Sequence, residues 1–249
     1  MSHEILLFGD SHSEAIFQAA ALRKKRLKPS LVEVHRTRRQ KGEIFIGDTS
    51  LEEFLKLASG LGKDDVVVTM IGGNQHAVFS TIQHPVRFDV IEPGMTADDV
   101  APGAEIIPYR MVSSAIDSYL RVRDGPSLTA LRDATSARLI LIVPPPPKRD
   151  GDFIRNYHET RFKHDIAELG VSSAELRMKI WRMQRNLLHA FCGELNVEAM
   201  DPPKDTVDAD GYLLPKFYAN DATHANRDYG LLLLDVLEQR FGPEQKDVA

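Results

Sequence analysis

The chain has 249 residues, of which 43% are hydrophobic and 27% are charged, and its formal net charge is −5. This length is enough for one large α/β domain, and the mild acidity disfavours nucleic acid as the main partner, because phosphate binding usually needs a basic surface. The only cysteine, Cys192, excludes an intrachain disulfide, and no apolar run approaches the length of a membrane span.

Strand-like and helix-like segments alternate along the chain. In chain order, the predicted elements are a strand at 4–9, a helix at 14–26, a strand at 31–35, a helix at 51–59, strands at 65–73 and 137–144, a helix at 174–191, a weaker strand at 196–202 and a helix at 227–241. The strand runs are nearly continuously apolar, as strands covered on both faces must be. This alternation predicts a single α/β domain with a parallel sheet between two layers of helices.

Polar residues that can cap helices precede each helical pattern. The candidate caps are Ser13, Thr49 or Ser50, and Ser172, with Glu52 or Glu53 and Glu175 placed for capping boxes. The last helix starts after Asn226. Within the helix that Ser172 would open, Cys192 continues an apolar pattern, so we interpret it as a core residue and not as a nucleophile.

Two long stretches interrupt the alternation. Residues 77–111 are rich in Pro and Gly, and residues 144–171 open with four prolines. Each follows a predicted strand, so each leaves the sheet at its carboxyl edge, where ligands bind in open α/β folds. We therefore expect both insertions to form walls of a pocket.

Four short polar stretches stand at the ends of strands or the starts of helices. They are "FGDSHS" at 8–13, "IGDTS" at 46–50, "IGGNQH" at 71–76 and "NDATHAN" at 220–226. The first two have an ordinary structural interpretation as a glycine turn and a helix cap. In the last stretch, Asp221 and His224 are three residues apart, so their side chains can meet within one turn.

In this order the four stretches resemble the blocks of the SGNH hydrolases, also known as the GDSL esterase/lipase family. The resemblance puts the nucleophile at Ser11, the block-two glycine at Gly47, the block-three asparagine at Asn74, and the acid and base at Asp221 and His224. It extends over the whole chain apart from the two insertions. It implies a flavodoxin-like, three-layer α/β/α fold whose five parallel strands have the order 2-1-3-4-5.

The chemistry of ester cleavage needs these residue types. A serine hydroxyl is a poor nucleophile unless a base such as His224 takes its proton, and Asp221 can hold that imidazole in the right tautomer. The backbone N–H groups of Ser11 and Gly47 and the amide of Asn74 would stabilise the tetrahedral oxyanion. The resemblance implies no cofactor and no metal.

Residues next to these blocks are candidates for the substrate pocket. We assign Asp10, His12 and His76 to this group because they flank the nucleophile and the block-three asparagine. The chain departs from the family at Gln75, where an aspartate is usual. That aspartate is generally not catalytic, so the departure concerns how the loop is supported.

The expected function is serine-dependent hydrolysis of short acyl esters, such as O-acetyl groups of carbohydrates or small metabolites. The insertions contain no long amphipathic helix of the kind that covers long-chain lipases. An acyltransferase or thioesterase on the same residues, and a catalytically silent ligand-binding protein, remain alternatives. A metallophosphoesterase could use Asp10 and His12 as ligands, but the adjacent Asn-His pair of that class is missing, since Gln75 stands between Asn74 and His76.

The expected partner is therefore a small-molecule or carbohydrate ester, with no nucleic acid and no membrane span. The first predicted strand begins within a few residues of Met1, which leaves no room for a signal peptide, so we expect a cytoplasmic location. The oligomeric state stays open at this stage.

Overall fold

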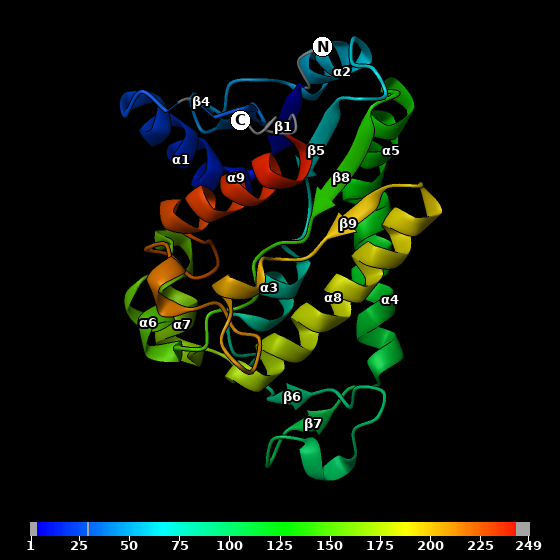
Figure 1. Cartoon of the computed structure of the whole chain (residues 1–249). Coiled ribbons are helices and arrows are strands. Elements are labelled where there is room, and N and C mark those ends of the chain that lie inside the picture. Colours follow the sequence, from blue (N-terminus) through cyan, green and yellow to red (C-terminus); the bar gives the residue numbers. More distant parts are fainter. Residues whose placement is uncertain (1–3, 29, 243–249) are drawn as a thin grey trace.

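A five-stranded parallel sheet lies at the centre of the computed structural model, which describes residues 4–28 and 30–242 (Figure 1). Its strands are β1 (Ile5–Gly9), β2 (Val32–Arg36), β5 (Val66–Met70), β8 (Arg138–Ile142) and β9 (Glu198–Met200). They have the order β2-β1-β5-β8-β9, and every neighbouring pair is parallel. The five predicted strands and the order 2-1-3-4-5 implied by the SGNH resemblance are both confirmed.

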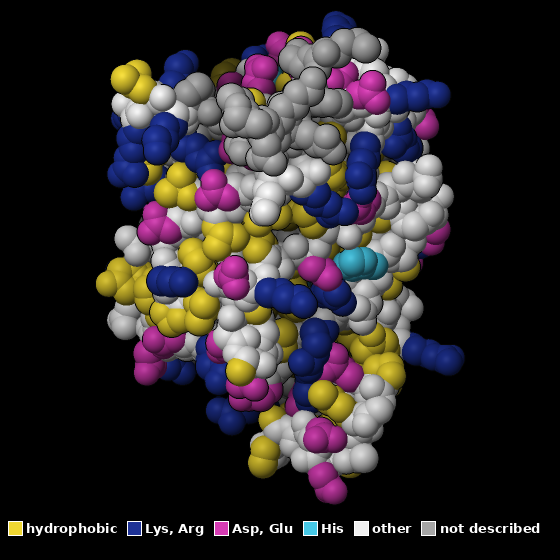
Figure 2. Space-filling model, in the orientation of Figure 1, with side chains coloured by type: hydrophobic (Ala, Val, Ile, Leu, Met, Phe, Trp, Pro, Cys, Tyr) yellow, Lys and Arg dark blue, Asp and Glu magenta, His cyan; other side chains and the backbone are white. Residues whose placement is uncertain are grey.

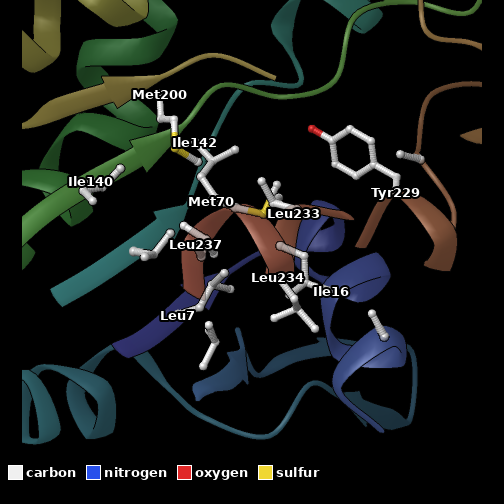
Figure 3. Close-up of a cluster of buried hydrophobic side chains, with 14 of the residues drawn as sticks. Leu7, Ile16, Met70, Ile140, Ile142, Met200, Tyr229, Leu233, Leu234 and Leu237 are labelled. Atoms are coloured by element: carbon white, nitrogen blue, oxygen red, sulfur yellow. The ribbon is translucent and has the colours of Figure 1, made fainter. Parts of the chain in front are cut away.

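Helices cover both faces of this sheet. One face packs against α1 (Glu14–Lys25) and α9 (Arg227–Phe241), and the other against α2 (Leu51–Ser59), α5 (Gly125–Ala134) and α8 (Ala174–Glu194). Successive strand residues alternate between the two layers: Leu7 joins the first cluster, and Leu6 and Phe8 join the second. Figure 3 shows the first cluster, in which leucines of α9 converge on side chains of β1 and α1.

α1 and α9 approach each other very closely. A Cβ atom added to Gly230 of α9 would lie 2.1 Å from the backbone oxygen of Ala15 in α1, so only glycine fits at this crossing. The contact matters for the site because α1 begins just after Ser11 and α9 begins just after His224.

Smaller elements occupy the connections between the strands. They are the hairpin β3 (Arg39–Lys41) and β4 (Ile44–Ile46), the pair β6 (Phe88–Asp89) and β7 (Glu105–Ile106), and the helices α3 (Gln75–Ser80), α4 (Tyr109–Tyr119), α6 (Gly151–Asn156) and α7 (Lys163–Leu169). The β6–β7 pair forms a small lobe at one end of the molecule, beyond α3 and α8 (Figure 1). This lobe belongs to the 77–111 insertion.

The helix starts confirm the sequence analysis at one place and correct it at another. Ser50 caps α2 and forms a full capping box with Glu53, as expected for one of the alternatives. The third expected cap is one residue too early, because Ser173 accepts the hydrogen bond from Leu176 N, whereas Ser172 donates to the backbone oxygen of Ile82.

The sequence analysis assigned no element to residues 112–136, where most of α4 and all of α5 lie. A π-helical segment, Leu120–Asp124, joins these two helices into one continuous path. Pro126 stands in the first turn of α5, where a proline is compatible with a helix.

The surface is mixed in charge. Acidic and basic side chains are interspersed over the face shown in Figure 2. Arg23 of α1 forms ion pairs with Asp235 and Glu238 of α9. Among the described helices, none has the length and hydropathy needed to cross a lipid bilayer.

Candidate active site

The first polar stretch forms a tight corner between β1 and α1. A Cβ on Gly9 would lie 2.9 Å from the Cβ atoms of both Met70 and Ser13, so glycine allows the close turn. Ser11 opens a short 3-10 turn, and α1 follows at residue 14. Ser13 stands at the cap position, but its hydroxyl donates to the backbone oxygen of Asp10 (2.7 Å) and does not cap the helix, contrary to the sequence expectation.

Ser11, His224 and Asp221 form one hydrogen-bonded chain, although 210 residues separate the first from the third along the sequence. His224 Nε2 lies 2.9 Å from Ser11 Oγ, and His224 Nδ1 lies 2.9 Å from Asp221 Oδ2. The carboxylate can only accept, so Nδ1 carries the proton and Nε2 is free to accept from the serine hydroxyl. This is the arrangement that a serine nucleophile needs.

Asp221 is also fixed by its own loop. Its Oδ1 accepts hydrogen bonds from the backbone N–H groups of Thr223 (2.9 Å) and His224 (2.7 Å). Burial alone would raise the pKa of the Asp221 carboxyl, but the bonds to His224 and the nearby positive charges outweigh it and hold that pKa below its ordinary value. The carboxylate is therefore ionised throughout the neutral range.

Asn74, in the third stretch, makes contact with a histidine from the first. Its Oδ1 lies 2.9 Å from Nε2 of His12, a side chain that is only 5% exposed. Burial lowers the pKa of His12 to about 3, and the neighbouring His224 and His76 add to this effect, so the ring is neutral. A neutral ring with its proton on Nε2 donates to Asn74 Oδ1, which leaves the amide N–H groups of Asn74 for another acceptor.

Gly47 lies against the end of β2. Its φ of +80° favours glycine, and an added Cβ would lie 2.2 Å from the backbone oxygen of Thr37. Thr37 N in turn donates to the backbone oxygen of Gly9 (2.8 Å), so the second stretch adjoins the nucleophile corner. Within residues 4–28 and 30–242, the N–H groups of Ser11 and Gly47 donate to no backbone or side-chain acceptor.

The turn before Asn74 is supported by residues that the sequence analysis missed. Gly72 and Gly73 both have positive φ, at 79° and 99°. A Cβ on Gly72 would lie 2.5 Å from Oδ2 of Asp124, which also accepts a hydrogen bond from Gln75 Nε2 (2.9 Å). The hydrogen bond between Gln75 and Asp124 thus supports the loop around position 75, which is where the chain departs from the usual aspartate.

The pocket beside Ser11 is a cavity of about 640 Å³. Polar side chains dominate its lining, with a tyrosine and three alanines as the apolar part: Ser11, Glu14, Ala15, Gln18, Arg39, Tyr218, Ala219, Asn220, Asp221, His224, Ala225, Asn226 and Arg227. Neither insertion, at 77–111 or 144–171, contributes a residue to this lining. The two insertions therefore do not form walls of this pocket, contrary to the sequence expectation.

Asp10, His12 and His76, the expected pocket residues, do not line this cavity either. His76 is 4% exposed, and its Nδ1 lies 2.8 Å from the backbone oxygen of Gly73, so it packs inside the block-three turn. His12 faces Asn74, and Asp10 accepts from the backbone N–H of His12 (3.2 Å). All three turn inward because the corner and the glycine turn need these hydrogen bonds.

Cys192 is fully buried, as expected for a core residue, and burial raises the pKa of its thiol to about 12. The described part of the chain contains no group of three or more His, Cys, Asp or Glu side chains that could hold a metal ion. Asp10 and His12, the candidate ligands of the metallophosphoesterase alternative, are engaged in the contacts given above.

No protein-family model matches the chain, and no curated protein matches it significantly in sequence. Solved structures resemble it at low identity. A GDSL-like lipase from Bacteroides thetaiotaomicron is 11% identical, with 96% of this chain and 87% of that chain covered and a TM-score of 0.47. Phospholipase A1 from Streptomyces albidoflavus (11%, 95% and 99%, TM-score 0.46) and a carbohydrate acetylesterase from Sinorhizobium meliloti (11%, 96% and 97%, TM-score 0.44) are similar to a comparable degree. At these values the function has to be inferred from the chain's own side chains.

Proposed function

We propose that the chain is a serine-dependent ester hydrolase that works through an acyl-enzyme. The observation that carries this proposal is the hydrogen-bonded chain from Ser11 Oγ through His224 to Asp221, with 2.9 Å at each link. Nothing in ligand binding alone requires these three groups in this order.

In the first half of the reaction, Ser11 Oγ attacks the acyl carbon while His224 Nε2 takes the hydroxyl proton. Asp221 stabilises the imidazolium that forms. The tetrahedral intermediate collapses, and the alcohol leaves with the proton that His224 returns. In the second half, water takes the place of the alcohol and the same proton transfers free the acid and restore Ser11.

Three donors serve the oxyanion in this proposal: the backbone N–H groups of Ser11 and Gly47 and the side-chain amide of Asn74. The bond from His12 to Asn74 Oδ1 supports the third assignment, because it fixes which end of the amide is engaged and leaves the N–H groups available. A neutral His12 also places no second positive charge beside the imidazolium that forms on His224 during the reaction.

The lining of the pocket supports a small, polar substrate. Glu14, Gln18 and Asn220 offer hydrogen-bonding groups of the kind that hydroxyl-rich molecules need, and the apolar part consists of alanines and Tyr218. A long acyl chain would need a larger apolar surface to compensate for its ordering. We therefore propose short acyl esters, such as O-acetyl groups of carbohydrates or small metabolites, as substrates.

The test uses p-nitrophenyl esters of increasing acyl length together with acetylated sugars. We expect turnover of the acetate and a steep fall towards the octanoate. Ser11→Ala should lower kcat by about 10⁴-fold or more, and Ser59→Ala, on the exposed end of α2, should leave it unchanged. A fluorophosphonate probe should label Ser11 in the wild type. Absence of labelling at Ser11 would refute the proposal, and transfer of the acyl group to an added alcohol in preference to water would assign the chain to acyl transfer.

A further inference from the structure

Lys148 is a buried ammonium group that the reaction described above does not use. It follows the four prolines after β8 and is 1% exposed. Its Nζ donates to the backbone oxygens of Ala219 (2.7 Å) and Asp221 (2.5 Å) and lies 3.7 Å from the Asp221 Oδ1 atom. The rings of Phe153 and Tyr218 lie 4.9 and 5.1 Å from it.

These contacts all concern the loop that carries the acid and the base. A buried ammonium is costly unless hydrogen bonds and an opposite charge compensate for its lost hydration. Here two backbone carbonyls of the 219–224 loop and the carboxylate of Asp221 provide that compensation. The same contacts tie the loop to the segment that follows β8.

That segment is itself anchored to the helical layer. Arg177 of α8 donates to the backbone oxygens of Lys148 and Arg149, both at 2.9 Å, and Leu213 N donates to the backbone oxygen of Pro147. Lys148 therefore connects a fixed part of the fold to the loop of Asp221. Movement of this loop would have to break contacts that are shielded from water.

We propose, on the basis of the ester-hydrolase function above, that Lys148 is a positioning residue: it holds the 219–224 loop so that Asp221 faces His224. The 144–171 insertion thus acts on the reaction from behind Asp221, since it supplies no part of the pocket lining.

The charges around Lys148 determine the sign of the effect. The negative groups that act on its charge are Asp221 and Glu159, and the titratable side chain of Tyr218 lies against it. Arg177 meets the backbone oxygen of Lys148 and not its ammonium. Burial lowers the pKa of Lys148 to about 8, against the attraction of Asp221. Below that pH Lys148 carries a positive charge 3.7 Å from the Asp221 carboxylate. Removal of the Lys148 charge should therefore move the acid limb of the activity profile to higher pH. A shift of about one unit corresponds to a tenfold change in the fraction of imidazole that is neutral.

The test compares Lys148→Met, which keeps the length and removes the charge and the donors, with Lys163→Met, a change at an exposed lysine of α7. The kcat/KM for p-nitrophenyl acetate is measured from pH 5 to 10. We expect Lys148→Met to lose about tenfold or more at pH 7 and to shift its acid limb upward by about one unit, with Lys163→Met unchanged. A Lys148→Met profile that superimposes on the wild type would overturn the proposal.

A second measurement, on the wild type, keeps the proposal testable if the Lys148→Met variant does not fold. The ring-nitrogen NMR signals of His224 are followed in the wild type over the same pH range, and a further step near pH 8 is expected when Lys148 loses its proton. Absence of that step would contradict the proposal. The NMR signal does not depend on ester turnover. A wild type without hydrolase activity would therefore refute the proposed function, whereas the NMR titration would still test the contact between Lys148 and the loop.

Discussion

Acidification from pH 7 to pH 5 should destabilise the fold through two buried, uncharged histidines. Burial lowers the pKa of His12 to about 3 and that of His76 to about 4, whereas an unfolded histidine titrates near 6.5. At pH 5 the unfolded chain therefore binds two protons that the folded chain does not. The free energy of unfolding falls as the pH drops below 6.5, and it continues to fall until the folded values are reached.

The structure gives the size of this effect. Each histidine should lower the free energy of unfolding by about 2 kcal/mol between pH 7 and pH 5. Asp10 acts in the opposite direction, because burial raises the pKa of its carboxyl to about 6, and its proton uptake in the folded state returns about 1 kcal/mol. The expected net loss is about 3 kcal/mol, an upper estimate since buried sites relax on charging.

Urea unfolding at pH 7, 6 and 5 checks this prediction, with fluorescence of the only tryptophan, Trp181, as the signal. His76→Gln keeps a donor for Gly73 and removes one titrating group, so it should lose about 2 kcal/mol of the pH dependence. His164→Gln, at a site that is 85% exposed, should retain the full dependence. If wild type and His76→Gln depend on pH equally, the two histidines are not held neutral by burial and the reasoning fails.

The remaining predictions concern the oxyanion donors and the helix crossing. Asn74→Ala should lower kcat on p-nitrophenyl acetate by about 10²–10³-fold with little change in KM, and wild-type turnover in this variant would remove Asn74 from the site. His12→Leu keeps the bulk and removes the donor to Asn74, so its loss of kcat should be smaller than that of Asn74→Ala. An equal Tm in these two variants would show that the loss of kcat does not come from unfolding. Gly230→Ala should destabilise the fold by about 1–3 kcal/mol because its Cβ would overlap Ala15. The control is Gly193→Ala on α8, whose added Cβ would meet no atom within 4 Å and should raise Tm slightly. Equal Tm values for the two variants would contradict the close crossing.

The sheet could be predicted because its strands carry their signal locally. Near-continuous apolar runs such as 66–70 are compatible with few environments other than a strand covered on both faces. The helices of 109–134 were not predicted. Gly125 and Pro126 are residue types that usually end a helical pattern, and only the packed structure shows that the helical path continues through them. Residue-level caps were uncertain for a related reason, since two adjacent serines at 172 and 173 are equivalent in a sequence pattern.

The candidate site divides in the same way. Ser11, Asn74 and His224 belong to short motifs whose order along the chain is informative. Lys148 and Asp124 belong to no motif, because what matters about them is the backbone oxygens or side chains they meet from segments far away. Such long-range partners follow from tertiary packing, which a single sequence does not specify position by position.

The close crossing of α1 and α9 has a consequence for the order in which the protein becomes reactive during its synthesis. Four strands of the sheet and the corner with Ser11 are made before residue 143, but the base arrives at residue 224, and its loop is held from one side by a helix that ends at Phe241. A nascent chain that stops short of His224 would carry a serine with no proton acceptor. Reactivity therefore has to wait for the packing of α9 on α1, and a ribosome-bound intermediate would remain inert towards esters even if most of its sheet had formed.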